Sequence, residues 1–437
     1  MSKRKLIVIG AGPKSLAIAA KNKVLKELGV NAPDLIIIEK NEIAAHWTGN
    51  SGYTNGKMTL GTGPEKDIGY PYDTTEYSDE LNKSINTEML KFSWAHYLVA
   101  IGKYSDYVDR GKPFPKHYEY ANYLRWVFNE VKDNVIFKKG LVTSMDVVSK
   151  NKVTVSFHSE LGIGRVEGDG VVITGPGVSN THLNEIKDSR ILDIEKFWMN
   201  YKKLAFDSKT KIAIVGAGEN SASIALALGE IEESMKIDII VPTGVIFTRG
   251  ESYFENRVYS DPKSGNWADL TNDDKLNFIR RTDLGVFGQY AQNQLNERED
   301  VNIIAGRVNK ILPHADSLFI EHTYNKKVKS SSYDYVVIAT GFDQLKLVRD
   351  LMTETFLQKV KKELNVTCLN ESNLVDKIGK DMAIENYYPK IHLPMISRIK
   401  QGPGFANLSS LGRLSDQVLY PYVELKSEQT EKECIVC

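Results

Sequence analysis

The chain has 437 residues, of which 42% are hydrophobic. That is enough for two or three domains with cores of their own. Lysine plus arginine number 56 and aspartate plus glutamate number 56, so the net charge is zero and no broad basic surface for nucleic acid or anionic lipid is expected. The sequence contains neither a run of about 18 apolar residues nor a signal-peptide pattern. We therefore expect a soluble cytoplasmic protein that binds neither nucleic acid nor membrane.

The three cysteines, Cys368, Cys434 and Cys437, are too few for a disulfide framework. The last two form a Cys-Ile-Val-Cys tail, whose spacing matches a redox or metal pair or a prenylation box, but we expect this tail to be inert. The eight histidines fall in no zinc-binding pattern, so no metal site is predicted.

The N-terminal segment has the pattern of a dinucleotide-binding unit. A strand, a glycine turn, a helix and a second strand are predicted at residues 6–9, 10–15, 16–28 and 35–39. Gly10 and Gly12 let backbone N–H groups approach a pyrophosphate at the positive end of the helix dipole, and Ser15 takes the third glycine position. Glu39 ends the second strand, where an acid accepts hydrogen bonds from ribose hydroxyls, as expected for the adenosine of FAD.

A second unit follows about 200 residues later. The same four elements are predicted at residues 212–215, 216–221, 222–228 and 237–241. Gly216, Gly218 and Ser221 repeat the turn, but the second strand ends in Pro242 and offers no acid for an unphosphorylated ribose. This favours NADPH, with Arg249 as the nearest downstream cation for the 2′-phosphate. The alternative for Arg249 is an ordinary solvated arginine.

Two further strands border this second unit. Residues 170–174 lead into Gly175-Pro-Gly177, and residues 335–339 lead into a turn at Gly341. They resemble the two crossings between an outer and an inserted domain. We predict an α/β fold with two Rossmann-like domains, in which an NADPH domain at 205–330 is inserted into an FAD domain formed by 1–204 and 331–437.

Two such cofactors leave several chemistries open, because the difficult step belongs to the flavin. A disulfide reductase needs a redox cysteine pair, which the sequence lacks outside its tail. Electron transfer to another protein and oxygen activation both stay open on this evidence.

Long blocks spread over nearly the whole chain resemble the flavin-dependent N-hydroxylating monooxygenases, and most specifically the lysine N6-hydroxylases of mycobactin-type siderophore pathways. The blocks are Trp47-x5-Tyr53-Thr-Asn-Gly56, Leu60-Gly-Thr-Gly-Pro-Glu-Lys-Asp67-x-Gly69-Tyr-Pro-Tyr72, Tyr97-Leu98, Asp109-Arg-Gly-Lys-Pro113, Phe247-Thr-Arg-Gly-Glu251-x-x-Phe-Glu-Asn256, Ser260-Asp-Pro262, Arg281-Thr-Asp-Leu-Gly-Val-Phe287, Gln401-Gly-Pro-Gly-Phe405-x-Asn-Leu-Ser409 and Leu414-Ser-Asp416.

The resemblance implies that NADPH reduces FAD, that molecular oxygen forms a C4a-hydroperoxyflavin, and that a neutral substrate amine is hydroxylated. It implies L-lysine or a related amine as substrate and a homo-oligomer, commonly a tetramer. Lys66 and Asn256 match residues that hold the substrate, and Ser415 matches one near its carboxylate end. We also expect Trp47 and Gly341 to contribute to the cofactor sites.

The chain departs from the wider family at several positions. Leu60 and Gly61 replace a Met-Gln pair whose glutamine lies by the flavin, Thr48 replaces histidine, and Asp283 replaces asparagine. We predict that Asp283 positions the substrate ammonium and accepts a proton from it; the alternative is a carboxylate that caps the following turn.

Other substrates stay open: ornithine, a diamine such as cadaverine, and an acylated or carrier-linked lysine. Lys66 favours a substrate with a carboxylate over a diamine, because a cation needs an anion to pair with. A flavin-binding protein without turnover is the alternative from another class.

Overall fold

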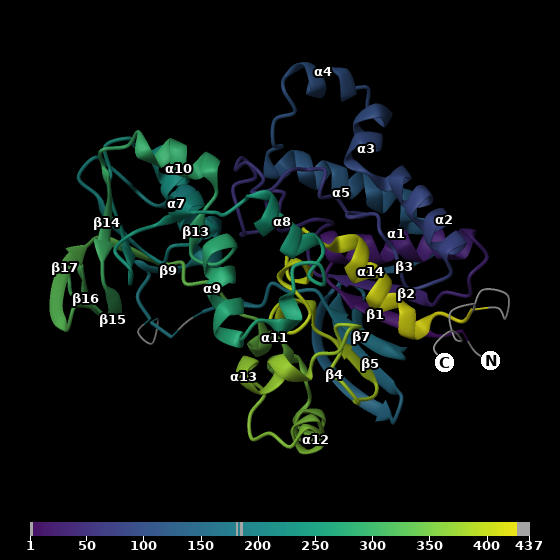
Figure 1. Cartoon of the computed structure of the whole chain (residues 1–437). Helices are drawn as coiled ribbons and strands as arrows, with labels where there is room; N and C mark the ends of the chain where they lie inside the picture. Colours follow the sequence, from purple (N-terminus) through teal and green to yellow (C-terminus); the bar gives the residue numbers. More distant parts are fainter. Residues whose placement is uncertain (1–2, 181, 184–186, 426–437) are drawn as a thin grey trace.

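The computed structural model describes residues 3–180, 182–183 and 187–425, and its framework is a pair of five-stranded parallel sheets (Figure 1). The first sheet has the order β20-β7-β1-β2-β3. Its strands are β1 (Lys5–Ile9), β2 (Asp34–Glu39), β3 (Val135–Lys139), β7 (Gly170–Ile173) and β20 (Lys390–His392). Side chains alternate along β1, so that Leu6 and Val8 enter one core and Ile7 enters the other.

Helices lie on the side of the first sheet that holds the first of these cores. They are α1 (Pro13–Glu27), α2 (Asp79–Met89), α3 (Trp94–Ala100), α4 (Tyr104–Asp109), α5 (His117–Val131) and α14 (Leu411–Leu419). Of these, α1, α2, α5 and α14 pack on the sheet or on α1 itself, whereas α4 has no buried residue and lies at the far end from it (Figure 1).

The opposite face of the first sheet packs against an antiparallel sheet and three helices. The strands are β4 (Leu141–Ser149), β5 (Lys152–Ser159) and β6 (Gly162–Gly168), and the helices are α11 (Gln344–Leu351), α12 (Glu354–Leu364) and the short α13 (Glu371–Leu374). The first sheet is therefore buried on both faces, as its continuous apolar strands require.

The second sheet has the order β14-β11-β10-β18-β9. Its strands are β9 (Ile191–Asp193), β10 (Lys211–Val215), β11 (Lys236–Val241), β14 (Val301–Ala305) and β18 (Tyr335–Ile338). One face carries α6 (Ile194–Asn200), α7 (Glu219–Gly229) and α10 (Gln289–Asn296). The other carries an antiparallel sheet of β15 (Arg307–Pro313), β16 (Leu318–Tyr324) and β17 (Lys327–Tyr333).

The two crossings between the sheets lie side by side. They form β8 (Val178–Ser179) and β19 (Phe342–Asp343), which pair antiparallel. The predicted α/β class with two Rossmann-like units, one inserted into the other, is confirmed. The second sheet also includes β9 and β18, which lie outside the predicted range 205–330; the division of the chain at 204 and 330 stays a prediction.

Four short elements lie between the two five-stranded sheets. They are α8 (Tyr253–Ser260), α9 (Asn272–Thr282) and the parallel pair β12 (Phe247–Thr248) and β13 (Val286–Phe287). In Figure 1, α8 occupies the centre of the molecule, between the two units. The chain connecting α8 to α9 is held to the first unit, since the Trp267 indole donates to the Ile399 carbonyl at 2.9 Å.

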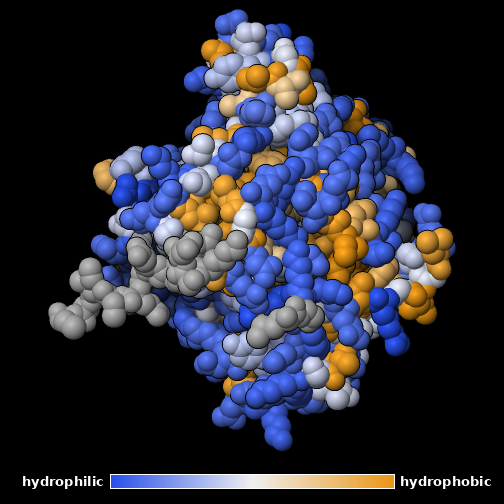
Figure 2. Space-filling view, turned by 90° about the vertical axis from the view of Figure 1, so that its right-hand side faces the viewer, coloured by the Kyte–Doolittle hydropathy of each residue, from blue (hydrophilic) through white to orange (hydrophobic). Residues whose placement is uncertain are grey.

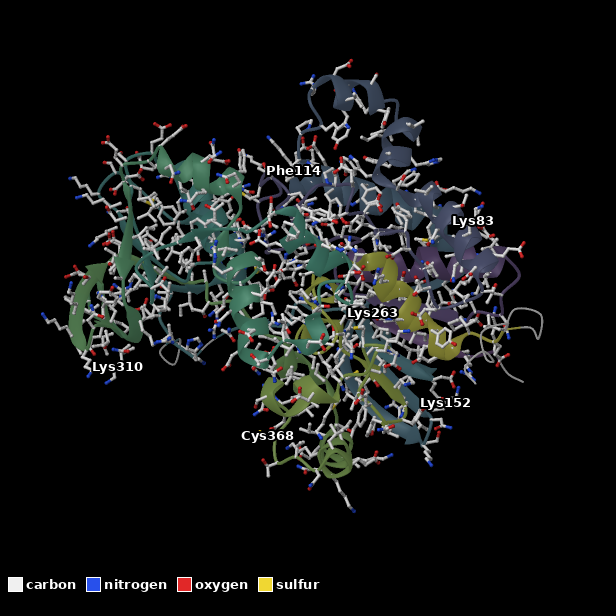
Figure 3. All side chains as sticks on the ribbon, viewed as in Figure 1. Lys83, Phe114, Lys152, Lys263, Lys310 and Cys368 are labelled. Carbon is white, nitrogen blue, oxygen red and sulfur yellow. The ribbon has the colours of Figure 1, made fainter. Side chains whose placement is uncertain are left out.

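The surface in Figure 2 is mostly hydrophilic, with separate hydrophobic patches. Among the described residues, no helix combines the length and apolar character needed to cross a bilayer. Cys368 is exposed near α13, in the lower part of Figure 3, while Cys434 and Cys437 lie outside the described residues.

Candidate active site

A cavity of about 300 Å³ lies where loops of the two units meet. Its lining comes from segments 46–66, 114–117, 219–223, 249–259, 282–291 and 407–409. Phe114, labelled in Figure 3, lies on this lining between the two sheets. The structure thus brings Trp47, Lys66, Arg249, Asn256 and Asp283 to one cavity, although they are distant in sequence.

The first glycine turn, residues 10–15, has the geometry of a phosphate-binding turn. Gly10 has φ +97° and a Cβ there would lie 2.6 Å from the Thr174 hydroxyl, so only glycine fits. A Cβ on Gly12 would instead meet open space. The Ser15 hydroxyl is buried with no hydrogen-bond partner among the described residues, and Glu39 accepts from the Ala11 N–H at 2.8 Å.

The second glycine turn, residues 216–221, repeats these features. Gly216 has φ +131° and a Cβ there would lie 2.4 Å from the Ala339 carbonyl oxygen, whereas a Cβ on Gly218 would meet nothing within 4 Å. The Ser221 hydroxyl is again buried without a partner among the described residues. Gly341, at the end of the neighbouring strand, has φ +89° and open space around it. Both turns therefore present an open approach and an unused hydroxyl to an incoming ligand.

Lys66 and Asn256 come from different units and meet in the cavity. The Lys66 ammonium donates to the Asn256 side-chain oxygen at 2.5 Å, and the Asn256 amide donates to the Glu251 carbonyl at 2.7 Å. A capping box between Ser252 and Glu255 starts α8 and fixes Asn256 on its first turn. Burial lowers the pKa of Lys66; Arg249 adds to this, and Glu251 opposes it.

Arg249 is not a solvated arginine, since its side chain is only 17% exposed. Its guanidinium donates to the Gly61 carbonyl of the first unit at 2.9 Å and lies 3.5 Å from Glu219 and 3.8 Å from Asp283. The structure therefore places Arg249 on the cavity wall, and its contact with a 2′-phosphate stays a prediction. Its charge is already shared between two carboxylates.

Asp283 follows the last residue of α9, and its backbone N–H donates to the Ile279 carbonyl at 2.8 Å. Its carboxylate lines the cavity and faces Arg249. Beside it, the Tyr259 and Thr282 hydroxyls are 2.7 Å apart, which ties α8 to α9. The position suits contact with a ligand, and its role stays a prediction.

Aromatic rings around Trp47 lie along one side of the cavity and form an aromatic wall. Trp47 packs edge-on against His117 and Tyr120, and the His117 ring nitrogen lies 3.1 Å from the Thr54 hydroxyl. Burial lowers the pKa of His117 to about 3 and that of His46 to about 4. Both imidazoles are therefore neutral at physiological pH and supply no charge to the cavity.

Ser415 is the predicted substrate residue that the structure does not bring to the cavity. It is fully buried in α14, where its hydroxyl donates to the Gly412 carbonyl at 2.7 Å. The helix packs on α1, and the Ser415 side chain is buried within the first unit. Ser409, in the loop before α14, lines the cavity instead.

Two charged residues of the glycine turns had no signal that sequence reasoning used, and of these Glu219 lines the cavity. Glu219 lies inside the second glycine turn, directly after Gly218, yet only the structure turns its carboxylate toward Arg249. Lys14, inside the first turn, donates to the Ala406 carbonyl at 2.8 Å, and burial lowers its pKa to about 8.

The comparisons with known proteins agree on one kind of enzyme. The family model for L-lysine 6-monooxygenase/L-ornithine 5-monooxygenase matches residues 86–344. L-lysine N6-monooxygenase MbtG of Mycolicibacterium paratuberculosis is 34% identical over 418 residues, which cover 95% of this chain and 94% of that protein. The solved structure of lysine monooxygenase NbtG from Nocardia farcinica is similar with a TM-score of 0.83 and 35% identity, over 95% of this chain and 98% of that one.

A more distant likeness concerns the fold alone. The ornithine N-hydroxylase KtzI of Kutzneria sp. 744 has a TM-score of 0.74 at 17% identity, over 96% of this chain and 99% of that one.

Proposed function

The chain belongs to the L-lysine 6-monooxygenase/L-ornithine 5-monooxygenase family, and from this premise we propose that it uses FAD, NADPH and molecular oxygen to hydroxylate the terminal amine of L-lysine. The product, an N-hydroxyamine, is a precursor of hydroxamate siderophores. The observation that carries the proposal is the Lys66–Asn256 contact, which sets a cation and an amide in the cavity where loops of the two units meet.

The residues of both turns fit the two cofactors. The open space over Gly12 and Gly218 leaves room for a pyrophosphate, and the unpartnered hydroxyls of Ser15 and Ser221 are free to bond it. Glu39 has acceptor capacity left for ribose hydroxyls, because each carboxylate oxygen accepts more than one hydrogen bond. We assign FAD to the first unit and NADPH to the second. FAD, once reduced by NADPH, supplies the activation of oxygen.

The chain itself binds and orients the substrate. Lys66 offers a partly desolvated ammonium to the substrate carboxylate, and charge-assisted bonds of this kind are stronger than neutral ones. Asn256, held by the Glu251 carbonyl, keeps Lys66 in place and has acceptor capacity for the α-ammonium group. The aromatic wall around Trp47 limits the access of water to the reacting amine.

Lysine is proposed ahead of the other amines for two reasons. The relatives at 34% and 35% identity are named lysine monooxygenases. A diamine such as cadaverine has no carboxylate for Lys66. Ornithine and an acylated or carrier-linked lysine also carry a carbonyl group near this position, so they remain the comparison substrates. The expected homo-oligomer and cytoplasmic location stay predictions.

A substrate panel tests this function directly. The purified holoenzyme, supplied with NADPH and air, should form hydroxylamine from lysine with a higher kcat/KM than from ornithine, cadaverine or N6-acetyl-lysine. In Lys66→Met the KM for lysine should rise about tenfold to a hundredfold, because one charge-assisted contact is worth about 1.5–3 kcal/mol. The KM for cadaverine should change little.

The matched control is Lys57→Met, since Lys57 is exposed and pairs with Glu230 outside the cavity. Both variants should retain flavin and be reduced by NADPH at the wild-type rate. Peroxide as the only product with every amine would overturn the function, whereas an unchanged lysine KM in Lys66→Met would remove only Lys66 from the site.

A further inference from the structure

A carboxylate stands at the phosphate-binding end of the second unit. Glu219 is the first residue of α7 and follows Gly218 directly. The first N–H groups of a helix and its dipole attract anions, and in this fold they receive the dinucleotide pyrophosphate. An ionised side chain on that turn competes with the pyrophosphate for the same positive end and repels it.

Arg249 is the cation nearest to this carboxylate. It lies 3.5 Å from Glu219 and 3.8 Å from Asp283, and it also donates to the Gly61 carbonyl. Burial raises the pKa of Glu219, while Arg249 and a backbone N–H of Gly288 oppose this rise. Arg249 therefore favours the ionised carboxylate and cancels part of its charge.

The first unit holds Arg249 in this position. A Cβ on Gly61 would lie 3.3 Å from the guanidinium, which is tighter than an ordinary contact, so the bare glycine backbone lets the arginine approach. The guanidinium is thus fixed between a carbonyl of one unit and two carboxylates of the other. An arginine held on three sides is poorly placed to leave for a 2′-phosphate.

We propose that Arg249 promotes NADPH binding by neutralising Glu219 beside the pyrophosphate, and that it does not bind the 2′-phosphate. This role rests on the proposed function, because it takes the second unit as the NADPH site. Arg249 is then a positioning residue for the dinucleotide. Its effect falls on the pyrophosphate, which NADP⁺ and NAD⁺ share.

A double-mutant cycle on NADP⁺ affinity tests the proposal. The variants are Arg249→Gln, which keeps an amide donor for the Gly61 carbonyl, Glu219→Gln, and both together, each as the FAD-loaded protein. The Kd for NADP⁺ and NAD⁺ is measured by titration, without turnover. Arg249→Gln should raise the NADP⁺ Kd about tenfold in the wild-type background and less than about threefold beside Glu219→Gln. Glu219→Gln alone should tighten binding.

The competing role predicts the opposite coupling. If Arg249 binds a phosphate directly, Glu219 competes for it, so Arg249→Gln costs more affinity in the Glu219→Gln background. Direct binding of the 2′-phosphate also changes the ratio of NAD⁺ to NADP⁺ affinity, which our proposal leaves constant. An equal or larger cost in the double variant, or a changed ratio, overturns the proposal. A wild-type protein that binds neither dinucleotide overturns the proposed function with it.

Discussion

The charge of Asp283 and the proposed reaction favour opposite protonation states of the substrate amine. A carboxylate near the substrate amine stabilises the ammonium, whereas hydroxylation requires the neutral amine. In the structure Asp283 shares Arg249 with Glu219, so part of its charge is already balanced. This arrangement weakens its attraction for the ammonium while leaving it on the cavity wall as a hydrogen-bond acceptor.

The variant Asp283→Asn tests that role. We expect lysine to bind less well, and we expect less hydroxylated product and more peroxide for each NADPH consumed, because the amide holds the amine less firmly. The measurement is the ratio of hydroxylamine formed to NADPH oxidised. Asp273→Asn, on the exposed first turn of the same helix, is the matched control. An unchanged ratio together with a small loss of stability would assign Asp283 a purely structural role.

For single residues, the sequence predicted which residue types belong to the site better than it predicted their contacts. The predicted residues Lys66 and Asn256 meet in the cavity, because their long motifs specified both the side chain and its loop. Ser415 does not meet them, since α14 is buried in the first unit and its residues are not on the cavity lining, which the motif alone did not reveal. Glu219 was visible beside the glycine turn, but the direction of its carboxylate depends on Arg249, a residue of another loop.

At the scale of elements, each glycine turn contains one glycine that the backbone fold requires and one whose open space is needed only by a ligand. Gly12 and Gly218 have φ of −91° and −98° and open space at Cβ, so alanine fits both backbones. We expect Gly12→Ala to fold but to lose FAD, because the methyl group occupies the approach of the pyrophosphate. Gly218→Ala should keep FAD and be reduced slowly by NADPH. Flavin absorbance and the rate of anaerobic reduction measure the two effects.

Gly10→Ala serves as the contrast, because its φ of +97° and the Thr174 hydroxyl at 2.6 Å predict loss of the fold itself. Equal loss of flavin from the Gly12 and Gly218 variants would contradict the assignment of one cofactor to each turn.

The same turns explain where the sequence misplaced the starts of two helices. Both helices begin three residues earlier than predicted, at Pro13 and Glu219, because the turn residues enter the helix directly after Gly12 and Gly218. The sheet of β15, β16 and β17 was not predicted. Strand β17 is mostly polar and exposed, so it lacks the apolar alternation that reveals a strand.

At the scale of the whole molecule, Arg413 joins the two units near the substrate residues. It pairs with Asp73 of the first unit and, at 3.3 Å, with Asp261 at the end of α8. A Cβ on Gly404 would lie 2.0 Å from the Tyr259 carbonyl oxygen, so α8 is pressed against the loop before α14. The place of Asn256 therefore depends on contacts that reach α14.

Arg413→Met should loosen this junction. We expect a loss of about 1–2 kcal/mol in the free energy of unfolding, because two half-buried carboxylates lose their partner. The KM for lysine should rise while flavin content stays constant. Denaturant unfolding and steady-state kinetics measure the two effects, and Arg110→Met, which removes an exposed pair with Asp106, is the control. A normal KM despite the lost stability would show that Arg413 does not position α8.

The sequence predicted that one unit is inserted into the other, because each glycine turn follows a buried strand and each crossing ends in a glycine turn. The sequence did not predict that the short strands β9 and β18 belong to the second sheet. The pairing of β18 with β10 on one side and with β9 on the other is decided by contacts between distant segments, which strand patterns do not contain.

The pairing of β20 with β7 has a consequence for how the chain folds during synthesis. β7 ends at Ile173 and its neighbour begins at Lys390, so the entire second unit is translated between the two strands. At a synthesis rate of about 5–20 residues per second, β20 emerges on the order of 10–40 s after β7. Until then the backbone groups on the side of β7 that faces β20 have no partner strand. Every strand of the second sheet has already been synthesised by that time. The second unit is therefore expected to fold first, and the first unit completes its sheet only after the second unit has folded.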